Sequence, residues 1–187
     1  MTRKSEILAG KKILFLSSTE FGHRTREFRE AMSLHNAGAD VTVYGYCAQV
    51  PELWDRSPIK TEIFVPETRG NIASENPVWA IRVFLNLTVN IVRRAIRRLT
   101  SRKIEMNNFR KRGVGFHPDI IHAMDLPSLA DAARVAKKTH AKLVYDSSEY
   151  WIGFMQNEVW KSWGGLAVDY TKDEKKYINQ TDLILTT

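Results

Sequence analysis

The 187-residue sequence has a single cysteine, Cys47, so the chain can form no internal disulfide. Absence of disulfides is typical of a reducing compartment, and Cys47 is predicted to be a small core or surface residue. With 43% hydrophobic residues, a chain of this length can bury a sizeable core without disulfides or metals. One domain over residues 1–187 is therefore expected.

Other familiar signals are also absent. The N-terminus, MTRKSEILAGKK, lacks the apolar core of a signal peptide. The sequence has no zinc-ligand spacing, no GxGxxG dinucleotide fingerprint, no internal repeat and no low-complexity tract. These absences predict a cytoplasmic protein without a metal site.

Positive charge is concentrated in one segment. Residues 82–112 carry ten basic side chains and one acidic side chain, a net +9, so the remainder of the chain carries −2 of the formal +7. An anionic partner would therefore be expected to bind this segment.

Short apolar runs alternate with helical patterns along most of the sequence. KILFLSS, residues 12–18, is predicted to be a parallel strand buried on both faces, followed by a helix over 24–36 that ends near Gly38. Further strands are predicted at 40–46, 61–65, 118–123, 142–145 and 183–185, and further helices at 78–106, 130–138 and 166–179. This alternation predicts an α/β fold: a Rossmann-like, doubly wound, mostly parallel sheet with helices on both faces.

Polar residues follow three of the predicted strands, within residues 17–27, 122–125 and 146–149. In doubly wound sheets, ligands bind where loops converge at the carboxyl ends of the strands. The three loops therefore predict one binding crevice. The alternative is that they are ordinary strand ends, which are commonly polar.

In the first of these loops, Gly22 would let the backbone approach a ligand, and His23 and Arg24 could bind a phosphate or a sugar hydroxyl at a helix start. The alternative is an exposed helix start. His122 lies within an apolar run, where it is either a ligand contact or a satisfied core residue. Asp125 either lines the crevice or caps a helix that begins at Pro127.

Glu149 lies between Ser148 and the aromatic pair Tyr150 and Trp151. A carboxylate beside aromatic faces could bind sugar hydroxyls. The same residues could instead pack a loop.

Three segments together resemble the N-terminal half of family-4 (group 1) retaining glycosyltransferases of the GT-B fold. Residues 117–151, HPDIIHAMDLPSLADAARVAKKTHAKLVYDSSEYW, are similar to family strands that read roughly DVVHAHDLP and KLVYDSHELW. Residues 11–46 resemble the family's first strand, acceptor loop, helix and second strand, and residues 173–187 resemble its helix and strand leading to the second domain. The resemblance spans most of the chain except about residues 50–115.

The resemblance implies an acceptor crevice that contains His122, Asp125, Asp146 and Glu149. Two positions depart from the family pattern. Met124 and Ser148 stand where the family has histidines, and methionine neither exchanges a proton at neutral pH nor donates a strong hydrogen bond. The catalytic residue is therefore not identified.

The resemblance also implies the partners. A nucleotide-sugar donor would be held mainly by a C-terminal domain absent from this chain, so no cofactor is expected to bind the chain alone. The expected enzyme is a hexosyltransferase of the retaining type, without an obligatory metal, which acts in cell-surface polysaccharide or glycolipid synthesis. This chain would be the half that binds a saccharide or polyprenyl-linked acceptor, inactive unaided. The alternative is a non-catalytic binding or scaffold module that acts with a partner chain.

The basic segment, about residues 78–112, has the pattern of an amphipathic helix. Its arginines lie beside Trp, Phe and Leu, which favours peripheral contact with an anionic membrane surface on the cytoplasmic side. The candidate contacts are Arg93, Arg94, Arg97, Arg98 and Arg102. The alternatives are a solvated crossover helix and, disfavoured because no recognition motif accompanies the charge, a nucleic-acid site.

Overall fold

The computed structural model describes residues 8–21, 25–47, 50, 52–64, 106–147 and 170–186. The chain divides into two compact units, one made of Met1–Phe64 with Arg110–Thr187 and one made of Val65–Phe109. The first unit contains the sheet. Most of the second unit lies outside the described residues, so the helix predicted over 78–106 and the single domain over 1–187 remain predictions.

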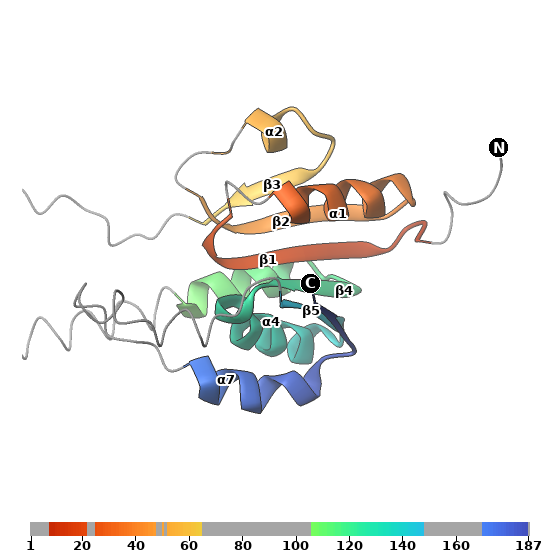
Figure 1. The fold of residues 1–187 in the computed structure, drawn as a ribbon. Coiled ribbons are helices and arrows are strands. Elements are labelled where there is room, and N and C mark those ends of the chain that lie inside the picture. The colour runs from red at the N-terminus through yellow and green to blue at the C-terminus, as the bar shows by residue number, and fades with distance from the viewer. Residues whose placement is uncertain are drawn as a thin grey trace, which may run out of the picture. The chain divides into compact units, whose positions relative to one another are not determined.

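The sheet has six strands, and all five of its strand pairings are parallel. The strand order is β3-β2-β1-β4-β5-β6, so the chain starts at the centre, builds outward to one edge, and then returns to build the other (Figure 1). The strands are β1 (Lys12–Glu20), β2 (Asp40–Tyr46), β3 (Lys60–Ile63), β4 (Ile120–Met124), β5 (Lys142–Ser147) and β6 (Leu183–Thr186). This arrangement confirms the predicted doubly wound fold and places its switch point between β1 and β4.

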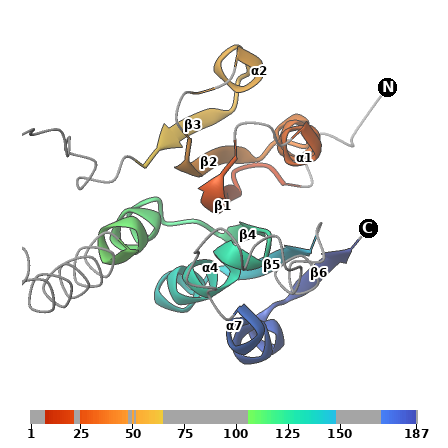
Figure 2. The ribbon, with the colours of Figure 1, turned by 60° about the vertical axis from the view of Figure 1, so that its left-hand side comes forward.

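Helices cover both faces of the sheet, as predicted (Figures 1 and 2). Among the described residues the helices are α1 (Thr25–Asn36), α2 (Glu52–Asp55), α4 (Leu126–Thr139), α7 (Tyr170–Tyr177) and the 3-10 helix η1 (Ile178–Gln180), and residues 106–115 are also helical. Phe15 of β1 belongs to the core under α1, together with Ala31 of that helix. The next residue, Leu16, lies near Val135 of α4, because alternate strand residues point to opposite faces.

Some predicted boundaries were wrong. The helix predicted from residue 130 begins at Leu126, and β5 continues two residues past the predicted end at Tyr145. Asp146 therefore lies near the carboxyl end of β5 rather than in a loop, and it pairs with Met124 of β4. The short helix α2 lies in a region for which the sequence predicts no helix.

Aspartates fix the amino ends of two strand pairs. Asp119 accepts a hydrogen bond from the backbone N–H of Lys12 at 2.8 Å, and Asp182 accepts one from the N–H of Leu143 at 2.8 Å. The backbone bond from Lys12 is the main cause that lowers the pKa of Asp119 from 3.8, whereas for Asp182 the main cause is the hydrogen bond from Lys142. Each carboxylate thus holds a neighbouring strand in register.

These two aspartates predict an acid-dependent loss of stability. Because their pKa values in the folded state lie below the ordinary 3.8, their contribution is complete above that pH and is lost as the pH falls through the folded values. The double variant Asp119→Asn with Asp182→Asn should be less stable than the parent at about pH 7, and the gap should narrow between about pH 4 and about pH 2. Urea unfolding across this range would measure it, with the exposed Asp55→Asn as the control. A gap that stayed constant with pH would contradict the assignment.

Candidate functional site

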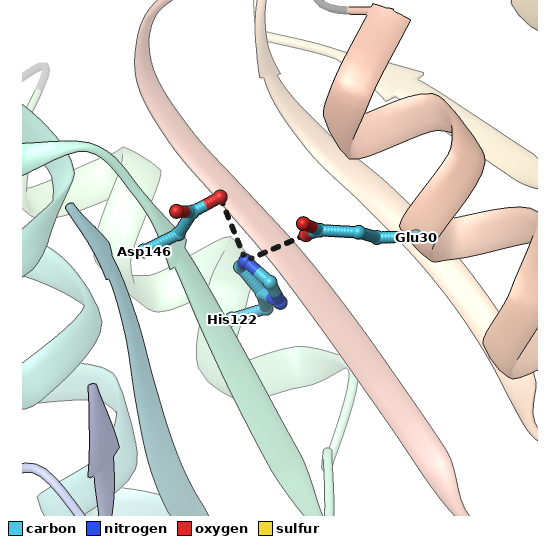
Figure 3. Close-up of side chains that lie close together, drawn as sticks. All are labelled: Glu30, His122 and Asp146. Atoms are coloured by element: carbon cyan, nitrogen blue, oxygen red, sulfur yellow. Dashed lines mark ion pairs between the residues drawn. The ribbon is translucent and has the colours of Figure 1, made fainter. Parts of the chain in front are cut away.

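A cluster of ionisable side chains lies where α1, β4 and β5 meet (Figure 3). Glu30 comes from α1, His122 from β4 and Asp146 from β5. The imidazole Nε2 of His122 lies 3.6 Å from Oε2 of Glu30 and 3.6 Å from Oδ2 of Asp146. One face of the His122 imidazole ring lies against an apolar side chain, because the ring stacks on Phe15 with centroids 4.2 Å apart.

Arg26, one turn before Glu30 on α1, joins the two carboxylates. Its Nε donates a hydrogen bond to Oε1 of Glu30 at 3.0 Å, and its Nη2 lies 2.9 Å from Oδ1 of Asp146. The hydrogen bond to Glu30 is the main cause that raises the pKa of Arg26, and the charge of Asp146 adds to the effect. The guanidinium therefore stays charged at any physiological pH.

The cluster is largely removed from solvent. The side chain of Asp146 is 0% exposed and that of His122 is 5% exposed, whereas Arg26 and Glu30 are each a little over a quarter exposed. Within the described residues, Nε2 of His122, Oε2 of Glu30 and Oδ2 of Asp146 have no hydrogen-bond partner, whereas Oδ1 of Asp146 is ion-paired with Arg26. Buried polar atoms without hydrogen bonds cost free energy, so such a group is a candidate for ligand binding.

The local sequence explains how these side chains meet. Arg26 and Glu30 are four residues apart, which places them on the same side of α1. The β4–β5 register pairs His122 with Val144 and Met124 with Asp146. Alternation along the strands then puts His122 and Asp146 on the same face of the sheet, the face that α1 covers.

Two of the predicted site residues are therefore brought together. His122 and Asp146 lie in one cluster, and His122 is a buried residue with an unpartnered nitrogen rather than a satisfied core histidine. Five other predictions, for Gly22, His23, Arg24, Ser148 and Glu149, lie outside the described residues.

Asp125 occupies the N-cap position of α4, but its side chain makes no capping hydrogen bond. The predicted side-chain cap is therefore wrong, and so is the helix start at Pro127, because the helix begins one residue earlier. The backbone of Asp125 instead accepts a bond from Ser128 N–H at 3.0 Å and donates to the carbonyl of Asp146 at 3.1 Å. Its φ of 66° is an uncommon conformation for a non-glycine residue, of the kind found at functional turns.

Met124 is fully buried and belongs to the apolar core under α1. The position at which the resembled family has a second histidine is therefore filled by a packing side chain. It offers no polar atom to a ligand.

Arg26 and Glu30 were not predicted as site residues. The signal that could have found them is their opposite charge at a spacing of four, on a helix whose Phe28 and Met32 pack against the core. The spacing alone also describes many exposed ion pairs, so it does not identify a site without the sheet.

A separate hollow of about 350 Å³ lies at the amino end of the sheet, away from this cluster. It is lined by the starts of β1, β2 and β3 and by residues that follow the helix over 106–115, among them Lys12, Asp40, Lys60, Phe116 and Pro118. Ligands of doubly wound sheets bind at the opposite end of the strands, so we assign the site to the cluster. Among the described residues, no helix is long and apolar enough to cross a membrane.

Comparison with known proteins bears on the fold. No family model matches the chain, and no curated protein matches its sequence significantly. The crystal structure of MurG from Acinetobacter baumannii aligns with a TM-score of 0.54 at 9% identity, over 94% of this chain and 41% of MurG. The structure of Glycyrrhiza uralensis UGT73P12, complexed with glycyrrhetinic acid 3-O-monoglucuronide, aligns with a TM-score of 0.44 at 17% identity, over 78% of this chain and 29% of that one.

Both of these proteins are glycosyltransferases of the GT-B fold. The chain spans about two fifths of the length of MurG. At such low identity the likeness concerns the fold alone, and the second alignment is too weak to add to it. This chain therefore has the Rossmann-like α/β fold that is found in part of MurG, a GT-B glycosyltransferase.

Proposed function

We propose that this chain is the acceptor-binding half of a GT-B glycosyltransferase, which moves a sugar from a nucleotide-sugar to a saccharide or lipid-linked acceptor. The observation that carries the proposal is the buried cluster of Arg26, Glu30, His122 and Asp146 between α1 and the strands β4 and β5, in a fold shared with MurG. The resemblance of the HAMDLP and YDSSE segments to family-4 enzymes supports the same function.

The cluster has the chemistry to bind an acceptor hydroxyl. The carboxylates of Glu30 and Asp146 accept hydrogen bonds, and Arg26 donates them. Glu30 and Arg26 are partly exposed, so they are the members that a ligand can reach. Asp125 and the loop residues Gly22, His23, Arg24 and Glu149 would complete the acceptor crevice.

The donor would bind mainly to a second domain. The chain matches 41% of the length of MurG, which leaves room for a donor-binding half elsewhere in the complete enzyme. We propose that transfer retains the anomeric configuration of a hexose, needs no obligatory metal, and serves cell-surface polysaccharide or glycolipid synthesis. Residues 1–187 alone would not transfer sugar.

Calorimetric titration would test whether the nucleotide-sugar donor binds to the second domain rather than to residues 1–187. Residues 1–187, and a version extended to the natural C-terminus, would each be titrated with a panel of nucleotide-sugars and free nucleotides. Heat from the extended version only is the expected result, because the donor site belongs to the second domain. Tight donor binding by residues 1–187 alone would contradict it.

One observation favours a second function, that of a non-catalytic binding or scaffold module. Met124 is packed into the core where the resembled family has a histidine, so this chain lacks that catalytic group. If no nucleotide or nucleotide-sugar bound either version, the scaffold would be the better account.

The basic segment, about residues 78–112, suggests that the protein binds its acceptor at a membrane surface. Arg93, Arg94, Arg97, Arg98 and Arg102 lie outside the described residues, so peripheral binding to the cytoplasmic leaflet remains a proposal from sequence. Each basic residue near an anionic surface contributes about 1 kcal/mol, a term that salt screens. Liposomes with anionic lipid should retain the protein at low salt and release it at high salt. Failure to retain it at low salt, or equal retention by neutral liposomes, would contradict this proposal.

A further inference from the structure

We propose that Glu30, His122 and Asp146 bind one divalent transition-metal cation, of the zinc class, between α1 and the strands β4 and β5. The cluster offers one imidazole nitrogen and two carboxylate oxygens, all within 4.8 Å of one another. This inference does not rest on the proposed function, and it differs from the sequence-based prediction of no metal site.

The geometry of the three donor atoms carries the proposal. Donors placed tetrahedrally about 2.1 Å from a zinc ion stand about 3.4 Å apart. Nε2 of His122 lies 3.6 Å from Oε2 of Glu30 and 3.6 Å from Oδ2 of Asp146, close to that spacing. All three atoms lie within 4.8 Å of one another, so a cation bound between them would draw the two carboxylates inward.

The same three atoms lack other partners. Nε2 of His122, Oε2 of Glu30 and Oδ2 of Asp146 are buried and have no hydrogen-bond partner within the described residues. His122 and Asp146 are more than nine-tenths buried and aim these atoms at one another (Figure 3). A cation would coordinate all three atoms at once. Among the described residues, no protein group binds all three.

Arg26 orients the carboxylates without occupying these atoms. It contacts Oε1 of Glu30 and Oδ1 of Asp146, which leaves the second oxygen of each carboxylate directed toward His122. Outer contacts of this kind commonly orient metal ligands. Two carboxylates and one guanidinium carry a net −1, so the cluster still attracts a cation.

The donor set selects the class of cation. An imidazole nitrogen with two carboxylate oxygens suits Zn²⁺ and Co²⁺, whereas Mg²⁺ prefers six oxygen ligands in a regular octahedron. Three protein ligands leave at least one coordination position open. That position would take a water molecule.

The test is calorimetric titration of chelator-treated protein with Zn²⁺, Co²⁺ and Mg²⁺. One saturable site for Zn²⁺ and for Co²⁺, and no binding of Mg²⁺, is the expected result. Bound Co²⁺ should also give visible absorption bands. Glu30→Gln and His122→Asn should each weaken Zn²⁺ binding at least about tenfold, and a given Zn²⁺ concentration should raise the Tm of the parent more than that of Glu30→Gln.

Two matched controls separate this site from adventitious binding by surface histidines. His117 and His140 are exposed and have φ of 48° and 58°, a conformation that asparagine tolerates, so His117→Asn and His140→Asn should fold and bind Zn²⁺ as the parent does. Circular dichroism would confirm that each variant is folded. The proposal is overturned if no one-site binding is seen, if Mg²⁺ binds equally well, or if Glu30→Gln and His122→Asn bind Zn²⁺ as tightly as the parent does.

Discussion

Replacing Arg26 with alanine should lower the free energy of unfolding by about 3 kcal/mol. The guanidinium of Arg26 contacts the carboxylates of both Glu30 and Asp146, and the side chain of Asp146 is 0% exposed. Its removal leaves a buried carboxylate near a second one, with neither a guanidinium nor bulk water to offset the charge. Urea unfolding of the parent and of Arg26→Ala at neutral pH would measure the loss.

Arg29→Ala provides the matched control, because Arg29 is exposed on the same helix. Its change should stay within about 0.5 kcal/mol. Adding Asp146→Asn to Arg26→Ala should recover part of the loss, since it removes the uncompensated charge. Equal stability of Arg26→Ala and Arg29→Ala would show that the cluster does not form as described.

Gly45→Ala should destabilise the protein by at least about 3 kcal/mol, because it forces overlap within the sheet. A Cβ added at Gly45 would lie 2.5 Å from the carbonyl oxygen of Ser17 and 2.8 Å from its Cβ. Gly45 pairs with Ser17 near the carboxyl end of β1, where the chain leaves for the candidate crevice. Relief would require β1 and β2 to separate at this point.

Gly115→Ala is the control for the loss of a glycine. A Cβ added at Gly115 meets no atom within 4 Å. Thermal unfolding should therefore place Gly115→Ala at or slightly above the parent Tm and Gly45→Ala well below it. Similar melting of Gly45→Ala and the parent would mean that β1 and β2 are not paired in this register.

The fold was predictable because its signals are local and repeated. Continuous apolar runs predicted buried parallel strands, and Lys12–Glu20 and Asp40–Tyr46 lie at or close to their expected positions. The sequence predicts too early an end for β5 because Asp146 is polar, yet this residue is buried within the strand. The start of α4 was missed because Asp125 at positive φ lets the helix begin directly after β4.

The site was predictable only in part. His122 and Asp146 stand out because each follows an apolar run. Arg26 and Glu30 do not, since their spacing on α1 resembles that of an exposed ion pair. They come close to His122 only because α1 packs over strands β4 and β5, and this packing depends on tertiary contacts rather than on the local sequence.

The central claim, that this chain supplies the acceptor half of a glycosyltransferase, is tested most directly by turnover of the extended protein. Release of free nucleotide from a panel of nucleotide-sugars would be followed with saccharide acceptors and lipid extracts. We predict release that depends on an acceptor, and a raised acceptor KM in Glu30→Gln with little change for Arg29→Ala. A folded extended protein that released no nucleotide from any donor, with or without acceptor, would contradict the account.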